Sequence, residues 1–143
     1  MGAARTARGD AAVKARNAGR EALAVLLRQS RARTLRLIDA LASSLGPGLR
    51  VPRLPELNPP LWELGHIGWF ADRWISRNPQ TDLGSRADPD APLAPARQAA
   101  RGIDADALYD SSAVPHGERW SLPLPDLAGT RADLHASLED TLE

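Results

Sequence analysis

A tryptophan-rich stretch between Asn58 and Asn78 constrains the fold of this chain more than any other feature. It holds three of the four tryptophans, the only phenylalanine and one of the three histidines. Aromatic and basic residues recur there at spacings of three and four, which puts them on one helical face: Trp62, His66, Trp69, Phe70 and Arg73. The pattern predicts a helix with a histidine between aromatic side chains.

The ends of the stretch carry helix signals. Asn58 can cap the backbone N–H groups of a first turn, where the two following prolines are tolerated. Asn78 precedes Pro79, and a residue before proline is driven out of the helical region. Leucine and isoleucine make other faces apolar as well. A helix that is apolar on several sides is predicted to be buried.

Two glycines interrupt this predicted helix. Gly65 and Gly68 each cost roughly 1 kcal/mol of helix propensity relative to alanine. We expect a compensating gain, and close approach by a neighbouring helix would supply it.

Composition limits the classes of function. The 143 residues suit one domain with a moderate core. Equal counts of basic and acidic residues, 18 each, argue against nucleic acid or an anionic membrane as the main partner. Cysteine is absent, which excludes disulfides and thiolate metal sites, and no apolar run approaches a membrane span. We expect a cytoplasmic protein, and the near-absence of lysine suggests a GC-rich bacterial genome.

A long amphipathic helix is predicted from about Glu21 to Leu45, where leucines recur at steps of three and four. Gly46 follows it and ends it. The intervening arginines are interpreted as a solvated face rather than an anion-binding stripe. Residues 1–20, rich in alanine and arginine, are predicted to be a flexible N-terminus, and residues 21–143 to be one helical domain.

The segment from Pro79 to Pro123 is polar and proline-rich, with one helical turn predicted around Asp104 to Tyr109. A connection of this length in a compact domain is usually functional or disordered. Its second half, from Tyr109 onward, is more varied in composition. We expect that half to be ordered and packed on the helices.

A third helix is predicted to begin near Asp126 or Thr130, since Thr130 and Asp133 resemble a capping box. Its apolar face consists of Leu127, Leu134, Leu138 and Leu142. No stop signal closes it, and acidic residues occupy its last turn. We expect the helix to continue in a longer protein. The predicted fold class is all-α, with three helices and a long loop between the second and third.

The three histidines, His66, His116 and His135, fall on different predicted elements. A metal site built of imidazoles wants three converging ligands, often with a pair four residues apart. No such pair is present. On residue pattern alone, His66 is most simply a core histidine, and Ser111-Ser112 beside Asp110 is a turn rather than a nucleophile.

Two motifs carry a resemblance to a known family. Asn58-Pro-Pro-Leu-Trp-Glu-Leu-Gly-His66-Ile-Gly-Trp-Phe70 resembles the first motif of the DinB-like N-terminal domain of ergothioneine-synthase-type non-haem iron enzymes. Tyr109-Asp-Ser-Ser and Arg119-Trp-Ser-Leu-Pro-Leu-Pro125 resemble that domain's next block. The sequence of these motifs resembles that of the selenoneine synthases more closely still.

The resemblance implies a DinB-like four-helix bundle, here truncated to about three helices, and a formylglycine-generating-enzyme-like domain C-terminal to it in the parent protein. It implies Fe(II) held by three histidines, of which His66 is one and a His-x-x-x-His pair on an absent fourth helix supplies two. The family uses O2 to join sulfur or selenium to hercynine. Such open iron positions suit O2 and a soft donor. The chain alone is expected to be inactive.

One departure bears on the substrate. In the ergothioneine enzymes an Arg-x-x-Arg pair grips a carboxylate of the thiol substrate, and here that place reads His116-Gly-Glu-Arg119. Arginine and histidine are not equivalent as carboxylate clamps. His116 and Arg119 are therefore predicted to bind a less anionic donor, such as a selenosugar, rather than γ-glutamylcysteine. The alternative is that Arg119 only packs on Trp120 or pairs with Asp110.

Two other functions stay open. The chain could be a metal-free helical module that buries its tryptophan-rich face against a partner. It could also be a metal-dependent thiol transferase of the wider DinB group, with the histidine pair and no second domain.

Overall fold

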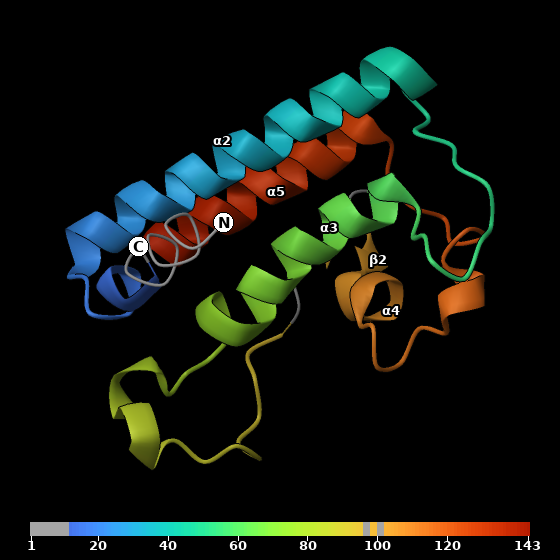
Figure 1. The fold of residues 1–143 in the computed structure, drawn as a ribbon. Helices are drawn as coiled ribbons and strands as arrows, with labels where there is room; N and C mark the ends of the chain where they lie inside the picture. The colour runs from blue at the N-terminus through green and yellow to red at the C-terminus, as the bar shows by residue number, and fades with distance from the viewer. Residues whose placement is uncertain (1–11, 96–97, 100–101) are drawn as a thin grey trace. The chain divides into compact units, whose positions relative to one another are not determined.

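The computed structural model describes residues 12–95, 98–99 and 102–143. Its helices are α2 (Arg20–Leu45), α3 (Pro60–Ala71), α4 (Ala105–Tyr109) and α5 (Leu127–Leu142), with short helical turns η1 (Asp72–Ser76), η2 (Thr81–Arg86) and η3 (His116–Glu118). The two-residue strands β1 (Gln98–Ala99) and β2 (Ile103–Asp104) pair antiparallel. The prediction of an all-α fold is confirmed (Figure 1).

Two compact units divide the chain within α2, after Arg36. The helix predicted from Glu21 to Leu45 is confirmed, and Gly46 ends it with a left-handed φ of 79°. Residues 1–11 of the predicted flexible N-terminus lie outside the described residues. The predicted boundary after residue 20 stays a prediction. All contacts discussed below belong to the second unit, Leu37–Glu143.

The packing of α3 explains its two glycines. A Cβ added at Gly68 would lie 3.2 Å from the side chain of Leu134 and 3.3 Å from that of Ser137, both on α5. A Cβ added at Gly65 would run into the ring of Tyr109 on α4. The expected close approach by a neighbouring helix is therefore confirmed at Gly68, and α4 adds a second one at Gly65.

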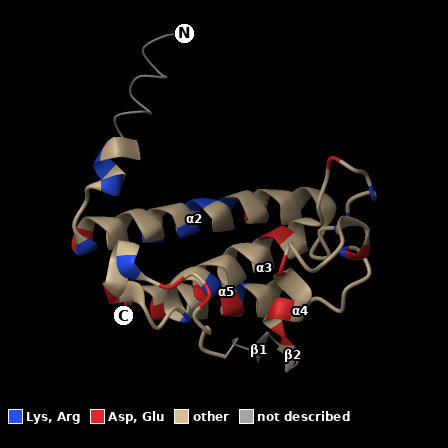
Figure 2. Ribbon diagram, turned by 90° about the horizontal axis from the view of Figure 1, so that it is seen from below, with Lys and Arg blue, Asp and Glu red and all other residues tan. Residues whose placement is uncertain are grey.

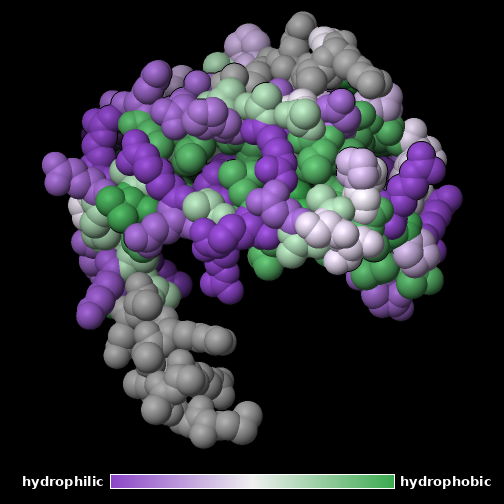
Figure 3. All heavy atoms as spheres, turned by 90° about the horizontal axis from the view of Figure 1, so that it is seen from above, coloured by the Kyte–Doolittle hydropathy of each residue, from purple (hydrophilic) through white to green (hydrophobic). Residues whose placement is uncertain are grey.

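Only one side of α3 is buried. Trp62, Leu64 and Trp69 are buried, with Trp62 and Trp69 in one cluster with Leu108 and Tyr109. On the other side Phe70 is 52% exposed, and Trp74 of the following turn η1 is 57% exposed. The prediction of burial on several sides was therefore wrong in part, because these rings extend beyond the contacts made by α4 and α5. Apolar side chains (green) and hydrophilic ones (purple) are mixed on the face that Figure 3 draws.

The predicted cap of α3 is wrong. Pro59, not Asn58, precedes the first helical residue, and none of the side chains that the structure describes caps that end. The amide of Asn58 instead donates to Glu63 and accepts from Arg119 Nη1 at 2.8 Å. The hydrogen-bonding atoms of its side chain are thus engaged by Glu63 and Arg119, and not by the backbone N–H groups of the first turn. At the other end α3 passes into the π-helical turn η1 before Arg77, which the regular pattern did not predict.

The capping box predicted at Thr130 is also wrong. Asp126 precedes α5 and accepts a hydrogen bond from the backbone N–H of Gly129 at 2.8 Å. The alternative start near Asp126 is thus confirmed. Thr130 already lies within the helix, fully buried, and its hydroxyl donates to the carbonyl of Asp126 at 2.9 Å.

The long segment after α3 begins as a closed loop. The N–H of Ala94 donates to the carbonyl of Arg77 at 2.9 Å, and Arg77 Nε donates to the carbonyl of Ala94 at 2.8 Å. The expected helical turn appears as α4, and the part after Tyr109 is ordered and packed, as predicted: Trp120 donates to the carbonyl of Val51 at 3.2 Å. Within the described ranges, no helix is long and apolar enough to cross a membrane.

Candidate functional site

The imidazole of His66 lies between two indoles of its own helix. Its ring centroid is 4.9 Å from that of Trp62 at an interplanar angle of 10°, and 5.3 Å from that of Trp69 at 25°. Phe70 lies 6.0 Å away in a tilted arrangement. The spacing of three and four residues along α3 brings these rings together, as the sequence predicted. His66 itself is half-buried.

One ring nitrogen of His66 is fixed by α4. Nδ1 lies 2.8 Å from the backbone carbonyl oxygen of Tyr109. A carbonyl oxygen only accepts, so Nδ1 carries the proton and Nε2 carries the lone pair of the neutral ring. Among the described residues no hydrogen bond engages Nε2. This is the arrangement usual for metal-binding histidines, whose second nitrogen donates to a carbonyl or carboxylate.

Asp106 of α4 is the common partner of polar side chains from α3, from η1 and from the residue that follows η1. It accepts from Trp69 Nε1 at 2.6 Å and from Arg77 Nη1 and Nη2 at 2.8 and 3.1 Å. Arg73 adds a weaker ion pair at 3.9 Å. The hydrogen bonds from Arg77, followed by the one from Trp69, lower the pKa of Asp106. Figure 2 shows acidic residues (red) on α4 and on the neighbouring β2.

This network predicts acid sensitivity. The pKa of Asp106 in the folded chain lies below its unfolded value of about 3.9. Its contribution to stability is therefore present above about pH 4 and is lost as the pH falls further. We expect the free energy of unfolding, measured by urea titration at several pH values, to fall less steeply below about pH 4 in Asp106→Asn than in the wild type. Equal slopes would contradict the assignment.

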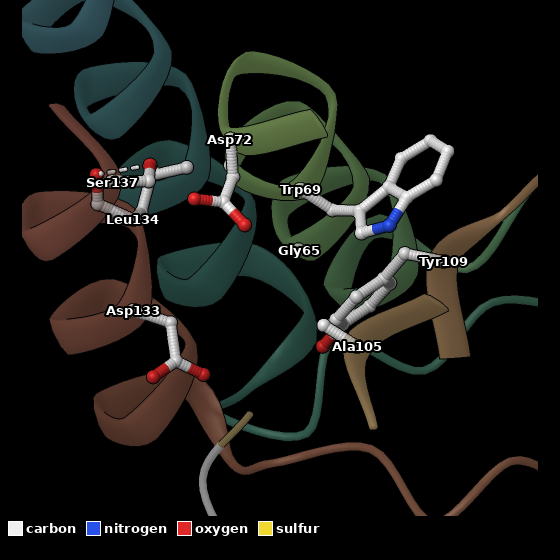
Figure 4. A pocket seen from close by; sticks show the side chains of 9 residues that line it. Gly65, Trp69, Asp72, Ala105, Tyr109, Asp133, Leu134 and Ser137 are labelled. Atoms are coloured by element: carbon white, nitrogen blue, oxygen red, sulfur yellow. Dashed lines mark hydrogen bonds between the residues drawn. The ribbon is translucent and has the colours of Figure 1, made fainter. Parts of the chain in front are cut away.

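A small cavity adjoins the same elements. It has a volume of about 30 Å³, room for roughly two water molecules, and is lined by α3, η1, α4 and α5. The hydroxyl of Tyr109 is buried there with no hydrogen-bond partner among the described residues. Burial and the nearby carboxylate of Asp133 raise the pKa of this hydroxyl. Figure 4 shows Asp72 and Asp133 beside the same space.

Arg119, predicted to bind substrate, makes contacts within the chain. Its guanidinium carbon lies 4.0 Å from the ring centroid of Trp62, and Nη1 donates to Asn58 at 2.8 Å. Nη2 reaches the carbonyl of Val114 at 3.4 Å. Arg119 thus packs on Trp62 rather than on Trp120 or Asp110. Its role toward a substrate stays a prediction.

His116 makes a comparable contact. Its Nε2 lies 2.7 Å from the carbonyl oxygen of Leu57, and its ring meets Trp120 edge-on at 5.2 Å. Together with Arg119 it ties the segment after α4 to the chain just before α3. Substrate binding by His116 likewise stays a prediction.

The three histidines do not form a metal site. His135 on α5 has a side chain that is 76% exposed and lies 3.8 Å from Glu139. In the part of the chain that the structure describes, no three His, Cys, Asp or Glu side chains are placed to hold a metal ion. The described residues fit one ligand, His66, and not a complete site. Ser112 donates to Asp110 at 2.6 Å, which confirms the turn predicted there.

Comparison with known proteins finds similarity to an enzyme that acts on hercynine. No protein-family model matches the chain. Over 129 residues it is 32% identical to the hercynine oxygenase of Mycolicibacterium smegmatis (strain ATCC 700084 / mc(2)155), and the match covers 87% of this chain and 26% of that protein. The chain thus spans about a quarter of the length of this curated relative. This supports the resemblance to ergothioneine-synthase-type enzymes; the closer likeness to selenoneine synthases stays a prediction.

Two residues of the site were not predicted from the sequence. Arg77 and Asp106 are 29 positions apart, and neither belongs to a periodic pattern. The one local signal was the helical turn predicted at Asp104 to Tyr109, which contains Asp106. Nothing in that signal indicates that its carbonyls and carboxylate face α3.

Proposed function

We propose that this chain is the N-terminal part of a non-haem iron, O2-dependent enzyme that forms a C–S or C–Se bond on hercynine, and that His66 is one of its iron ligands. The observation that carries the proposal is the geometry of His66. Its ring lies between two indoles, Nδ1 is hydrogen-bonded to the carbonyl of Tyr109, and no hydrogen bond among the described residues engages Nε2, which is the nitrogen that we propose binds iron. The similarity to a hercynine oxygenase supports the substrate class.

The chain's own residues would hold and orient this ligand. When bound, iron with open positions supplies binding of O2 and a soft sulfur or selenium donor. Trp62 and Trp69 restrict rotation of the imidazole, and the carbonyl of Tyr109 sets its tautomer. The two further ligands and the C-terminal domain would come from a longer parent protein, and this chain would be inactive by itself.

The test uses the longest open reading frame that contains this chain. We expect it to encode a helix with His-x-x-x-His and a second domain, and the purified protein to bind iron. His66→Gln should lower bound iron, measured by elemental analysis, by at least about tenfold, because substitutions even of groups behind a metal ligand cost roughly 10- to 100-fold in affinity. His135→Gln, at an exposed position, serves as the matched control and should bind iron normally.

Unchanged iron in His66→Gln would leave His66 as a packing residue. An iron-free protein from the full reading frame would favour the second candidate, a metal-free interaction module. The exposed rings of Phe70 and Trp74 favour that candidate, because they provide an aromatic surface for a partner. The pair of tests therefore separates an enzyme from a binding module.

A further inference from the structure

The last carbonyl groups of α4 accept hydrogen bonds from ring N–H groups of α3. A helix leaves its last carbonyls without intrahelical partners. In α4, the carbonyl of Leu108 accepts from Trp62 Nε1 at 2.8 Å, and that of Tyr109 accepts from His66 Nδ1 at 2.8 Å. Figure 1 shows this short helix beside α3. Trp62 and His66 are therefore held by two consecutive carbonyls of the same short helix.

The third ring, Trp69, is held by a side chain of α4 instead of its backbone. Trp69 Nε1 donates to the carboxylate of Asp106 at 2.6 Å. That carboxylate is itself fixed by two hydrogen bonds from Arg77, which is buried. A bidentate guanidinium leaves the carboxylate little freedom of orientation. Asp106 thus fixes the plane of the indole that covers one face of His66.

We propose that Asp106 is a positioning residue for His66: by holding the indole of Trp69, it keeps the imidazole between its two neighbours with Nδ1 on the carbonyl of Tyr109 and Nε2 free. The stacking distances on both faces are similar, so loosening either indole lets the imidazole tilt. A tilt lengthens the Nδ1 hydrogen bond and allows the other tautomer. The meaning of a free Nε2 as a metal ligand rests on the proposed function; the positioning does not.

The test reads the tautomer of His66 in the metal-free 143-residue chain. Long-range proton–nitrogen correlation spectra distinguish a protonated ring nitrogen from an unprotonated one. We compare the wild type with Trp69→Phe, which keeps an aromatic ring and removes the N–H donor, and with Asp106→Leu. In both variants we expect the ratio of Nδ1–H to Nε2–H tautomer to fall by roughly fivefold, the factor that corresponds to weakening the neutral hydrogen bond from Nδ1 to the carbonyl of Tyr109.

Two further variants separate positioning from general stability. Asp106→Asn keeps an acceptor for Trp69 and should restore most of the wild-type ratio. Asp110→Asn removes the same charge from a neighbouring carboxylate that pairs with Arg73 at 3.7 Å and does not bond Trp69; it should leave the ratio unchanged. Circular dichroism reports whether each variant folds. If Asp106→Leu does not fold, Trp69→Phe decides.

An unchanged ratio in folded Trp69→Phe would overturn the proposal, and a change in Asp106→Leu alone would show that Asp106 acts by holding α4 and not through the indole. Failure of the proposed function appears elsewhere, as normal iron content in His66→Gln of the longer protein. The finding that the His66 tautomer ratio depends on Asp106 would still hold after such a result.

Discussion

Replacing Gly65 with alanine is expected to destabilise the chain by about 2 kcal/mol, although alanine is the better helix former. The new methyl group would run into the ring of Tyr109, which is 3% exposed. Overpacking of this kind typically costs about 1–3 kcal/mol or more, which outweighs a helix gain of roughly 1 kcal/mol when the ring cannot leave its site. Urea denaturation, followed by circular dichroism, measures the change.

Gly48→Ala is the matched control for this substitution. A Cβ there meets only the flexible side chain of Arg50, at 3.6 Å or more, so the free energy of unfolding should change by less than about 0.5 kcal/mol. Gly68→Ala should fall between the two, since its nearest neighbour, Leu134, is 3.2 Å away. A Gly65→Ala chain as stable as the wild type would mean that α4 does not pack against α3 as described.

Arg77→Ala is expected to cost about 3 kcal/mol. Arg77 is 8% exposed, and its loss removes the bidentate partner of Asp106 and the Nε donor to the carbonyl of Ala94. Removing one member of a buried ion pair costs about 3–5 kcal/mol, and the lower end applies because the side chain of Asp106 is 31% exposed. Urea denaturation measures the loss, and hydrogen exchange should show faster opening at Ala94.

Arg73 provides the comparison for Arg77. It carries the same charge and approaches the same carboxylate, but at 3.9 Å and with 29% of its side chain exposed. Arg73→Ala should therefore cost less than about 1 kcal/mol. Arg77→Lys should be intermediate, because an ammonium group cannot reproduce the two parallel hydrogen bonds. Equal losses of stability for Arg73→Ala and Arg77→Ala would contradict the larger contribution assigned to the bidentate hydrogen bonds of Arg77.

Local patterns in the sequence predicted the helices well. The leucine spacing indicated α2, and the glycines of α3 indicated close neighbours, because both signals concern residues within a few turns of one another. The aromatic surroundings of His66 followed from the same spacing. The exposure of Phe70 and Trp74 did not, since apolar residues on a helix do not say which side a neighbour covers.

Contacts between distant segments were missed for a different reason. Asn58 is a good cap residue, yet its amide binds Arg119, 61 positions away. The hydrogen-bond partner of His66 is 43 positions away on a helix of five residues. No period or motif encodes such pairings. They depend on how the connection after α3 returns, which only the folded structure shows.

The mutual bonds between Arg77 and Ala94 also bear on what evolution or engineering can change. These residues are 17 positions apart, and the chain leaves and returns at one point. Doubling the length of such an excursion costs only about 0.6 kcal/mol in closure entropy. Insertions between Asn78 and Leu93 should therefore be tolerated, and this loop is the natural place to attach a tag, a fluorophore or a second domain without moving His66.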